Sequence, residues 1–190
     1  MKDADGCRRR TIPRGAWIVA LALLVRAVYV VFGVARRGGV AQVSDFLYTH
    51  QLADSLAHGR GFTIEGVPIF NQSVGYPAFL APFYAVLGAH VAVALALNVL
   101  LGAASAWLVY RLTDVLLADA GGTGVGRPAA GPAARVAGVL AAVYPDSLLY
   151  AGLVSAENLL IPILLLLALA VVTRFRHPWA QGVVVGLLAA

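Results

Sequence analysis

The chain has 190 residues, of which 61% are hydrophobic and only 12% are charged, and its mean hydropathy is +0.84. A soluble domain usually carries about 25% charged residues, so this composition excludes an ordinary soluble domain and indicates a membrane protein. The 14 basic residues are spread over several gaps between apolar runs. That distribution is typical of topology determinants and unlike a nucleic-acid-binding face, so no nucleic-acid partner is expected. The single cysteine, Cys7, excludes an internal disulfide and a thiolate metal site.

Residues 1–15 form a basic tail, and the first apolar run follows from Ala16 to Ala35. A helix of that length measures about 30 Å, enough to cross the hydrocarbon layer. Four arginines precede the run, so we expect a cytoplasmic N-terminus in a multi-pass protein of the plasma membrane. A cleaved secretory signal peptide is the alternative. The run is longer than the apolar region of such signals, and further apolar runs follow it, which favours a membrane span.

Further apolar runs predict spans over residues 90–110, 136–150 and 159–173, and a last run covers only the nine residues 182–190. Nine residues cannot cross a bilayer, so we expect the chain to be the N-terminal part of a longer protein. The run from Gly75 to Gly88 is short and contains Pro77 and Pro82. It therefore predicts a surface-lying or re-entrant helix inside an outside loop, residues 36–89.

With these spans, three separate arginine-bearing stretches fall on the cytoplasmic side, as the positive-inside rule requires. The predicted fold class is all-α. We expect a polytopic transmembrane helix bundle whose extracytoplasmic first loop carries short juxtamembrane helices.

Two carboxylates fall on the same extracytoplasmic side in this topology. Asp45 lies about ten residues after the first span, and Glu157 opens the fourth. Carboxylates near a membrane surface are costly to desolvate and are often functional. The alternative is that both are solvated loop or cap residues. Arg26 lies in the middle of the first span, where it needs a partner within the bundle or in helices beyond this fragment or, alternatively, a lipid phosphate.

The stretch from Asp45 to Gly59 has helical periodicity. Apolar side chains recur every four residues on one side, and His50, Asp54 and His58 recur with the same period on the opposite side. Because side chains at i and i+4 meet on one helix face, these three could ligate a divalent metal, the only cofactor candidate in the chain. A solvated helix face without a metal is the alternative.

Taken in order, several segments resemble the start of GT-C glycosyltransferases, above all the protein O-mannosyltransferase and aminoarabinose transferase branch. Those enzymes use polyprenyl-phosphate sugars as donors. The segments are Ser44-Asp45, residues 53–62, 75–84, 97–102 and 141–145, and residues 153–159, and together they cover nearly the whole chain. The resemblance depends on the order and spacing of these segments.

The resemblance implies that Asp45 is the catalytic base. A positioned carboxylate would take the proton of an acceptor hydroxyl as it attacks the anomeric carbon, and the leaving lipid phosphate is already a stable anion. Glu157 matches a recurrent acidic position, and Tyr76 belongs to the matched Gly-Tyr-Pro, so both are expected to bind substrate. Arg60 is a basic residue of the same loop and is expected at the lipid phosphate. The chain departs from the family at Ser73-Val74, where a Pro-Pro is common.

The function that this resemblance implies is transfer of a sugar from a polyprenyl-phosphate carrier to an acceptor hydroxyl or amine on the extracytoplasmic side. The expected partners are the lipid-linked donor and the bilayer. The alternatives are a non-catalytic membrane protein, such as a transporter subunit or a lipid-binding scaffold, and an inactive truncated relic. A transporter should place polar residues near the bilayer midplane, where Arg26 and Asn98 are the candidates.

Overall fold

The computed structural model describes residues 15–34, 45–69, 71–120 and 131–174. In these ranges the protein is 80% helical and has seven α-helices, in agreement with the all-α prediction. The predicted incomplete run 182–190 and the N-terminal tail up to residue 14 lie outside the described residues. The elements are α1 (Ala16–Val28), a π-helical continuation η1 (Tyr29–Val34), α2 (Asp45–Ala57), β1 (Thr63–Ile64), β2 (Val67–Pro68), α3 (Gly75–Leu87), α4 (Val91–Ala120), α5 (Pro132–Val143), α6 (Pro145–Ala151) and α7 (Glu157–Arg174).

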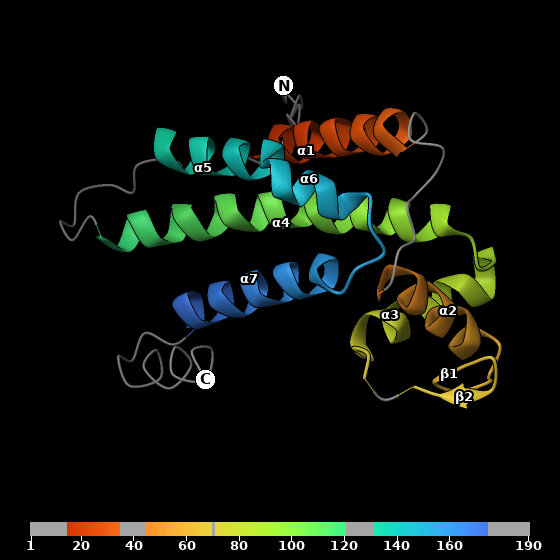
Figure 1. Cartoon of the computed structure of the whole chain (residues 1–190). Helices are drawn as coiled ribbons and strands as arrows, with labels where there is room; N and C mark the ends of the chain where they lie inside the picture. Colours follow the sequence, from red (N-terminus) through yellow and green to blue (C-terminus); the bar gives the residue numbers. More distant parts are fainter. Residues whose placement is uncertain (1–14, 35–44, 70, 121–130, 175–190) are drawn as a thin grey trace, which may run out of the picture.

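Helix α4 is the central element of the protein. It packs against α1 and α5 on one side and against α7 on the other (Figure 1). The α2–α3 unit, defined as residues 45–87, gathers beside the beginning of α4 (Figure 1). We call the end of the bundle that carries this unit the α3 end. The loop between α6 and α7 also reaches the α3 end, because Val154 packs into the same buried cluster as Ala53 of α2 and Tyr76 of α3.

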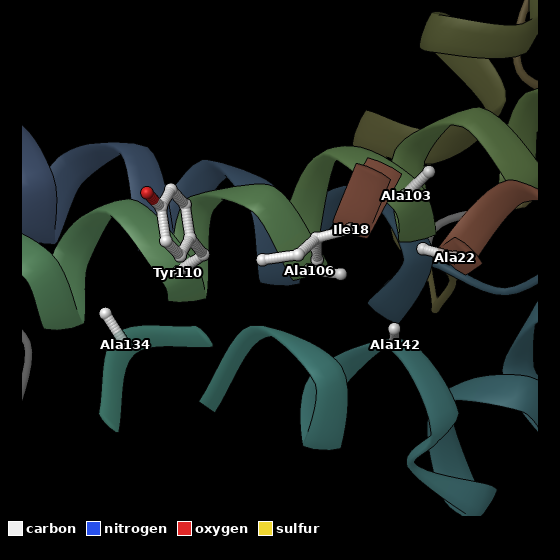
Figure 2. Packing of buried hydrophobic residues seen from close by; sticks show 7 residues of the cluster. All are labelled: Ile18, Ala22, Ala103, Ala106, Tyr110, Ala134 and Ala142. Carbon is white, nitrogen blue, oxygen red and sulfur yellow. The ribbon is translucent and has the colours of Figure 1, made fainter. Parts of the chain in front are cut away.

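The interface between α1, α4 and α5 is built from small residues, with Ile18 and Tyr110 as its large members (Figure 2). Its buried alanines are Ala22, Ala103, Ala106, Ala134 and Ala142. In Figure 2, Ala134 and Ala142 of α5 point toward α4 and α1. Small side chains allow helix backbones to approach one another closely.

Two helices are long and apolar enough to cross a membrane within the described ranges. They are α1 with most of η1, Ala16–Gly33, and the greater part of α4, Val91–Leu117. Three shorter apolar helices, α3, α5 and α7, accompany them. The apolar lengths of α1 and α4 agree with two of the predicted spans, although α4 continues ten residues beyond the predicted end at Tyr110.

The predicted span 136–150 is divided in the structure. Helix α5 ends at Val143, and α6 begins only two residues later at Pro145. Tyr144 between them has φ −60° and ψ 120°, an extended conformation. A residue before proline avoids helical backbone angles, and proline itself fits the first turn of a helix, so the Tyr144-Pro145 pair interrupts the helix here.

A β-hairpin, which the sequence analysis did not predict, lies between α2 and α3. Thr63 pairs with Pro68 and Ile64 with Val67 in antiparallel register. Both turn residues, Glu65 and Gly66, have positive φ angles of 52° and 81°. Two central residues with positive φ match the type I′ turn that favours two-residue hairpins, and Gly66 takes up such angles without strain.

Candidate functional site

The candidate site is the α3 end of the bundle, where the sequence-predicted site residues fall on α2, α3 and the start of α7. Tyr84, Leu80 and Tyr76 of α3 are buried in one cluster with Ala53 of α2 and Ala94 of α4. This apolar contact fixes the α2–α3 unit on the bundle. The buried cluster therefore holds α2 and α3 in fixed positions, and with them the side chains on the outer faces of these helices.

Asp45 is the first residue of α2, and Glu157 is the first residue of α7. The Asp45 side chain lies outside what the structure describes. The Glu157 side chain is exposed, and one of its carboxylate oxygens accepts a hydrogen bond from the Ser155 hydroxyl. An acidic residue in the first turn interacts favourably with the helix dipole and stabilises the helix by about 0.3–1 kcal/mol. Both positions therefore also suit a purely structural role.

Arg60 lies beyond the other end of α2. The helix axis from Asp45 to Ala57 is about 18 Å long at 1.5 Å per residue. The Arg60 guanidinium is 2.7 Å from a carboxylate oxygen of Asp54. The structure therefore does not bring Arg60 beside the start of α2, and its charge is engaged by Asp54 rather than directed toward Asp45.

The turn that carries Arg60 ends α2 in a defined way. The amide of Arg60 donates to the carbonyl of Ser55 at 2.9 Å, and the amide of Gly59 donates to that of Leu56 at 3.0 Å. This pair of bonds is the Schellman motif, whose left-handed position Gly59 occupies with φ 71°. The backbone thus determines where Arg60 emerges.

Tyr76 is a buried core residue with an exposed fraction of 1%. Its hydroxyl donates to the side-chain oxygen of Asn98 on α4, and its ring stacks on Phe79. The Asn98 amide in turn donates to the carbonyl of Leu153 at 2.8 Å. Tyr76 therefore connects α3 to α4 and to the α6–α7 loop, and its hydroxyl is already used in that connection.

The α6–α7 loop is held by a second buried amide, which the sequence analysis missed. The Asn158 amide donates to the carbonyls of Tyr150 at 2.9 Å and Leu153 at 3.0 Å. Leu153 thus accepts from both Asn98 and Asn158. The available sequence signal was a lone amide beside Glu157 at the start of an apolar run. These bonds fix the backbone immediately before Glu157.

His50, Asp54 and His58 are not assembled as a metal site. The imidazole of His50 is hydrogen bonded to the Tyr84 hydroxyl at 2.8 Å, whereas Asp54 engages His58 at 3.1 Å and Arg60. Burial lowers the pKa of His50; Asp54 opposes that shift, and His90 adds to it. No group of three His, Cys, Asp or Glu side chains within the described ranges is placed to hold a metal ion.

Among the cavities lined by described residues, two have candidate residues in their walls. The first, of about 310 Å³, lies against the second half of α2 and the hairpin, and Asp54, Arg60 and Glu65 are among its lining residues. The second, of about 300 Å³, lies between α4, α6 and α7, with Arg26 and Ser147 in its wall. The first cavity is rich in hydrogen-bonding groups and is the more accessible to polar ligands.

The chain matches no family model, no curated protein and no solved structure.

Arg26 belongs to the packing of the bundle rather than to the α3 end. Its guanidinium donates to the carbonyls of Ala142 at 2.9 Å and Ala141 at 3.2 Å, and to the Ser147 hydroxyl at 2.9 Å. These contacts confirm the predicted partner within the bundle. They also explain how an arginine that is 1% exposed is tolerated, because the last carbonyls of α5 carry the negative end of its dipole.

Proposed function

We propose that this chain is a membrane glycosyltransferase of the GT-C type, or the N-terminal part of one. In this proposal it transfers a sugar from a polyprenyl-phosphate carrier to an acceptor hydroxyl or amine, with Asp45 as the base. The observation that carries the proposal is the order of the family-like segments along the chain. The geometry supports it in one respect: α2, which begins with Asp45, and the first turn of α7, which begins with Glu157, both lie at the α3 end.

The proposal includes a multi-pass membrane bundle. Only 17% of the Ala16–Gly33 window and 33% of the Val91–Leu117 window are buried inside the protein. Long apolar helices with so much uncovered surface need lipid or further helices around them, which distinguishes them from the core helices of a soluble protein. The alanine-rich interface of α1, α4 and α5 suits association within a bilayer, where close backbone approach replaces the hydrophobic effect.

Charge placement favours an extracytoplasmic α3 end. Arg111, Arg135 and Arg174 lie in the last third of α4, at the start of α5 and at the end of α7, away from the α3 end. Basic residues near span ends favour the cytoplasm. The described part of the α2–α3 unit carries Arg60, whose charge is paired with Asp54. In this orientation Asp45 lies on the extracytoplasmic side, where the proposed transfer would take place.

The proposed transfer requires a base, because the acceptor hydroxyl is a weak nucleophile. A carboxylate within hydrogen-bond reach of the acceptor hydroxyl removes its proton as the oxygen bonds to the anomeric carbon, while the bond from that carbon to the phosphate oxygen breaks. The phosphate leaves as a stable anion and needs no protonation. The second carboxylate, Glu157, is free to accept hydrogen bonds from sugar hydroxyls with the carboxylate lone pairs that Ser155 does not use. A requirement for a divalent metal stays a prediction without structural support.

The proposed mechanism is tested with Asp45→Asn in the complete gene product in its membrane. The substitution keeps the shape of the side chain and removes the base, and transfer is followed from a radiolabelled polyprenyl-phosphate sugar. General base catalysis typically contributes about 10²–10⁴-fold, so we expect a loss of at least roughly 100-fold. Asp114→Asn, a carboxylate in the last third of α4, is the matched control and should keep its activity. Full activity of the Asp45 variant would rule out the mechanism.

The proposed orientation has an independent test, because Cys7 is the only cysteine. In a Cys7→Ser background, Ser73→Cys places a thiol on an exposed site before α3, and Ala133→Cys places one at the exposed start of α5. A membrane-impermeant maleimide added to intact cells should label the first thiol and not the second. The reverse pattern would contradict the orientation.

A transporter or scaffold has less support from this geometry. The midplane candidates are Arg26 and Asn98, and both donate hydrogen bonds to backbone carbonyls of neighbouring elements. Side chains used in this way stabilise the packing of helices.

A further inference from the structure

The cavity beside the second half of α2 is the strongest unexplained feature of the α2–α3 unit. Its volume is about 310 Å³, at the lower end of the range for small-ligand sites. The polar residues that line it are Gln51, Asp54, Ser55, Arg60, Thr63 and Glu65. The apolar part of its wall comes from the hairpin, at Ile64 and Gly66. The Schellman turn after α2 and the type I′ turn of the hairpin hold these residues in place.

The charges in this cavity disfavour both anions and metal ions. The guanidinium of Arg60 is 2.7 Å from the carboxylate of Asp54, so an anion would have to compete with an existing ion pair. Glu65 adds a second carboxylate, which forms no ion pair with another described residue and repels an anion further. A metal ion would find only these two carboxylates, one of them already engaged, and hard cations prefer six or more oxygen ligands.

We propose that this cavity binds a neutral sugar unit. Gln51 and Arg60 supply N–H donors, the carboxylates of Asp54 and Glu65 supply acceptors, and Gln51 adds an acceptor of its own. A sugar hydroxyl donates one hydrogen bond and accepts others, so it matches a wall that carries both donors and acceptors. The C–H face of the ring would lie on Ile64.

The position of the cavity relative to Asp45 determines whether the bound sugar could be the reacting unit. From Asp45 to Asp54 the axis of α2 advances about 14 Å. A sugar in the cavity is therefore too far from Asp45 to be the reacting unit. If the chain has the proposed function, the cavity would bind a distal unit of an acceptor glycan whose reactive end lies near Asp45. Binding itself does not depend on transfer.

The test is saturation-transfer NMR on the full chain in nanodiscs, with D-mannose, D-glucose, maltose and mannobiose as probes and D-glucuronate as the charged comparison. We expect at least one neutral sugar to bind and D-glucuronate to bind more weakly. Gln51→Ala and Glu65→Gln should each lower the affinity roughly tenfold, which corresponds to about 1.4 kcal/mol. Asn71→Ala, an exposed amide that does not line the cavity, is the matched control and should bind like the wild type.

The proposal is overturned if no neutral sugar binds, if D-glucuronate binds as well as they do, or if both cavity variants bind like the wild type. These outcomes are separate from the fate of the proposed function. Sugar binding that Glu65→Gln weakens, in a protein whose transfer does not need Asp45, would leave the cavity proposal standing alone. Transfer that requires Asp45 without binding in the cavity would leave the enzyme proposal standing alone.

Discussion

The guanidinium of Arg26 on α1 donates a 2.9 Å hydrogen bond to the carbonyl of Ala142, which lies 116 positions further along the chain, at the end of α5. No carboxylate in the described part of the chain forms an ion pair with Arg26. The positive charge is instead matched by the carbonyls that α5 leaves unpaired where it ends before Tyr144-Pro145. A helix break and a buried charge, each costly alone, therefore stabilise one another.

This arrangement requires a glycine at position 102. A Cβ atom there would lie 2.8 Å from Cδ of Arg26. Gly102→Ala should therefore force the arginine out of place and lower the stability by about 1–3 kcal/mol, as overpacking usually does. Thermal unfolding in detergent checks this. Gly75→Ala, where an added Cβ meets no atom within 4 Å, is the matched control.

A double-mutant cycle separates the clash from a general intolerance of alanine in α4. Once Arg26→Ala has removed the long side chain, Gly102→Ala should cost nothing or stabilise the helix, because alanine is the better helix former. An equal loss of stability in both backgrounds would show that the arginine does not lie over Gly102.

The second prediction concerns the connection between α3 and α4. Tyr76→Phe removes the hydroxyl that donates to Asn98 and leaves a buried amide oxygen without that partner, at a cost of about 1–3 kcal/mol. Tyr110→Phe is the control, because Tyr110 is equally buried and its hydroxyl has no hydrogen bond within the described part of the chain. Urea or thermal unfolding should show a clearly larger loss for Tyr76→Phe. Equal losses would contradict the role given to the Tyr76 hydroxyl.

Hydropathy and periodicity were sufficient to predict where the helices begin but not which side chains contact one another. The starts of α1, α2, α3 and α4 fall within one residue of the predicted ones, because long apolar runs and turn residues mark them directly. Tyr76 was expected at a substrate and lies in the core instead. A tyrosine in a short apolar segment gives no sign of which neighbour its hydroxyl reaches. Arg60 was assigned to the lipid phosphate because it lies in the same loop as Asp45, whereas helix α2 separates the two residues in space.

The third prediction concerns the loop before Glu157. Asn158→Asp replaces an amide that donates to the carbonyls of Tyr150 and Leu153 with a carboxylate that cannot donate. The buried carboxylate would face carbonyl oxygens, so we expect a loss of at least about 2 kcal/mol and faster amide hydrogen exchange over residues 150–158. Exposed Glu157→Gln removes only the charge in the first turn of α7 and should lower stability by no more than about 1 kcal/mol. Unchanged exchange in the Asn158 variant would contradict this account of the loop.

The last prediction follows from the half-buried imidazole of His50. Burial lowers the pKa of His50 below its ordinary value of about 6.5; Asp54 partly offsets the shift, and His90 adds to it. Below about pH 6.5 the unfolded chain binds a proton at His50 more readily than the folded protein does, so the free energy of unfolding falls as the pH falls. The contribution of neutral His50 to stability is fully present only above about pH 6.5. Unfolding measured from about pH 8 to about pH 5 should therefore show a decline that His50→Gln reduces and that His58→Gln, at an exposed position, does not. A His50→Gln variant with the wild-type decline would show that another group is responsible.

The hydrogen bond between His50 and Tyr84 joins α2 to α3. Protonation of His50 at low pH should therefore loosen the α2–α3 unit, and amide hydrogen exchange in α2 should become faster as the pH falls, relative to the His50→Gln variant.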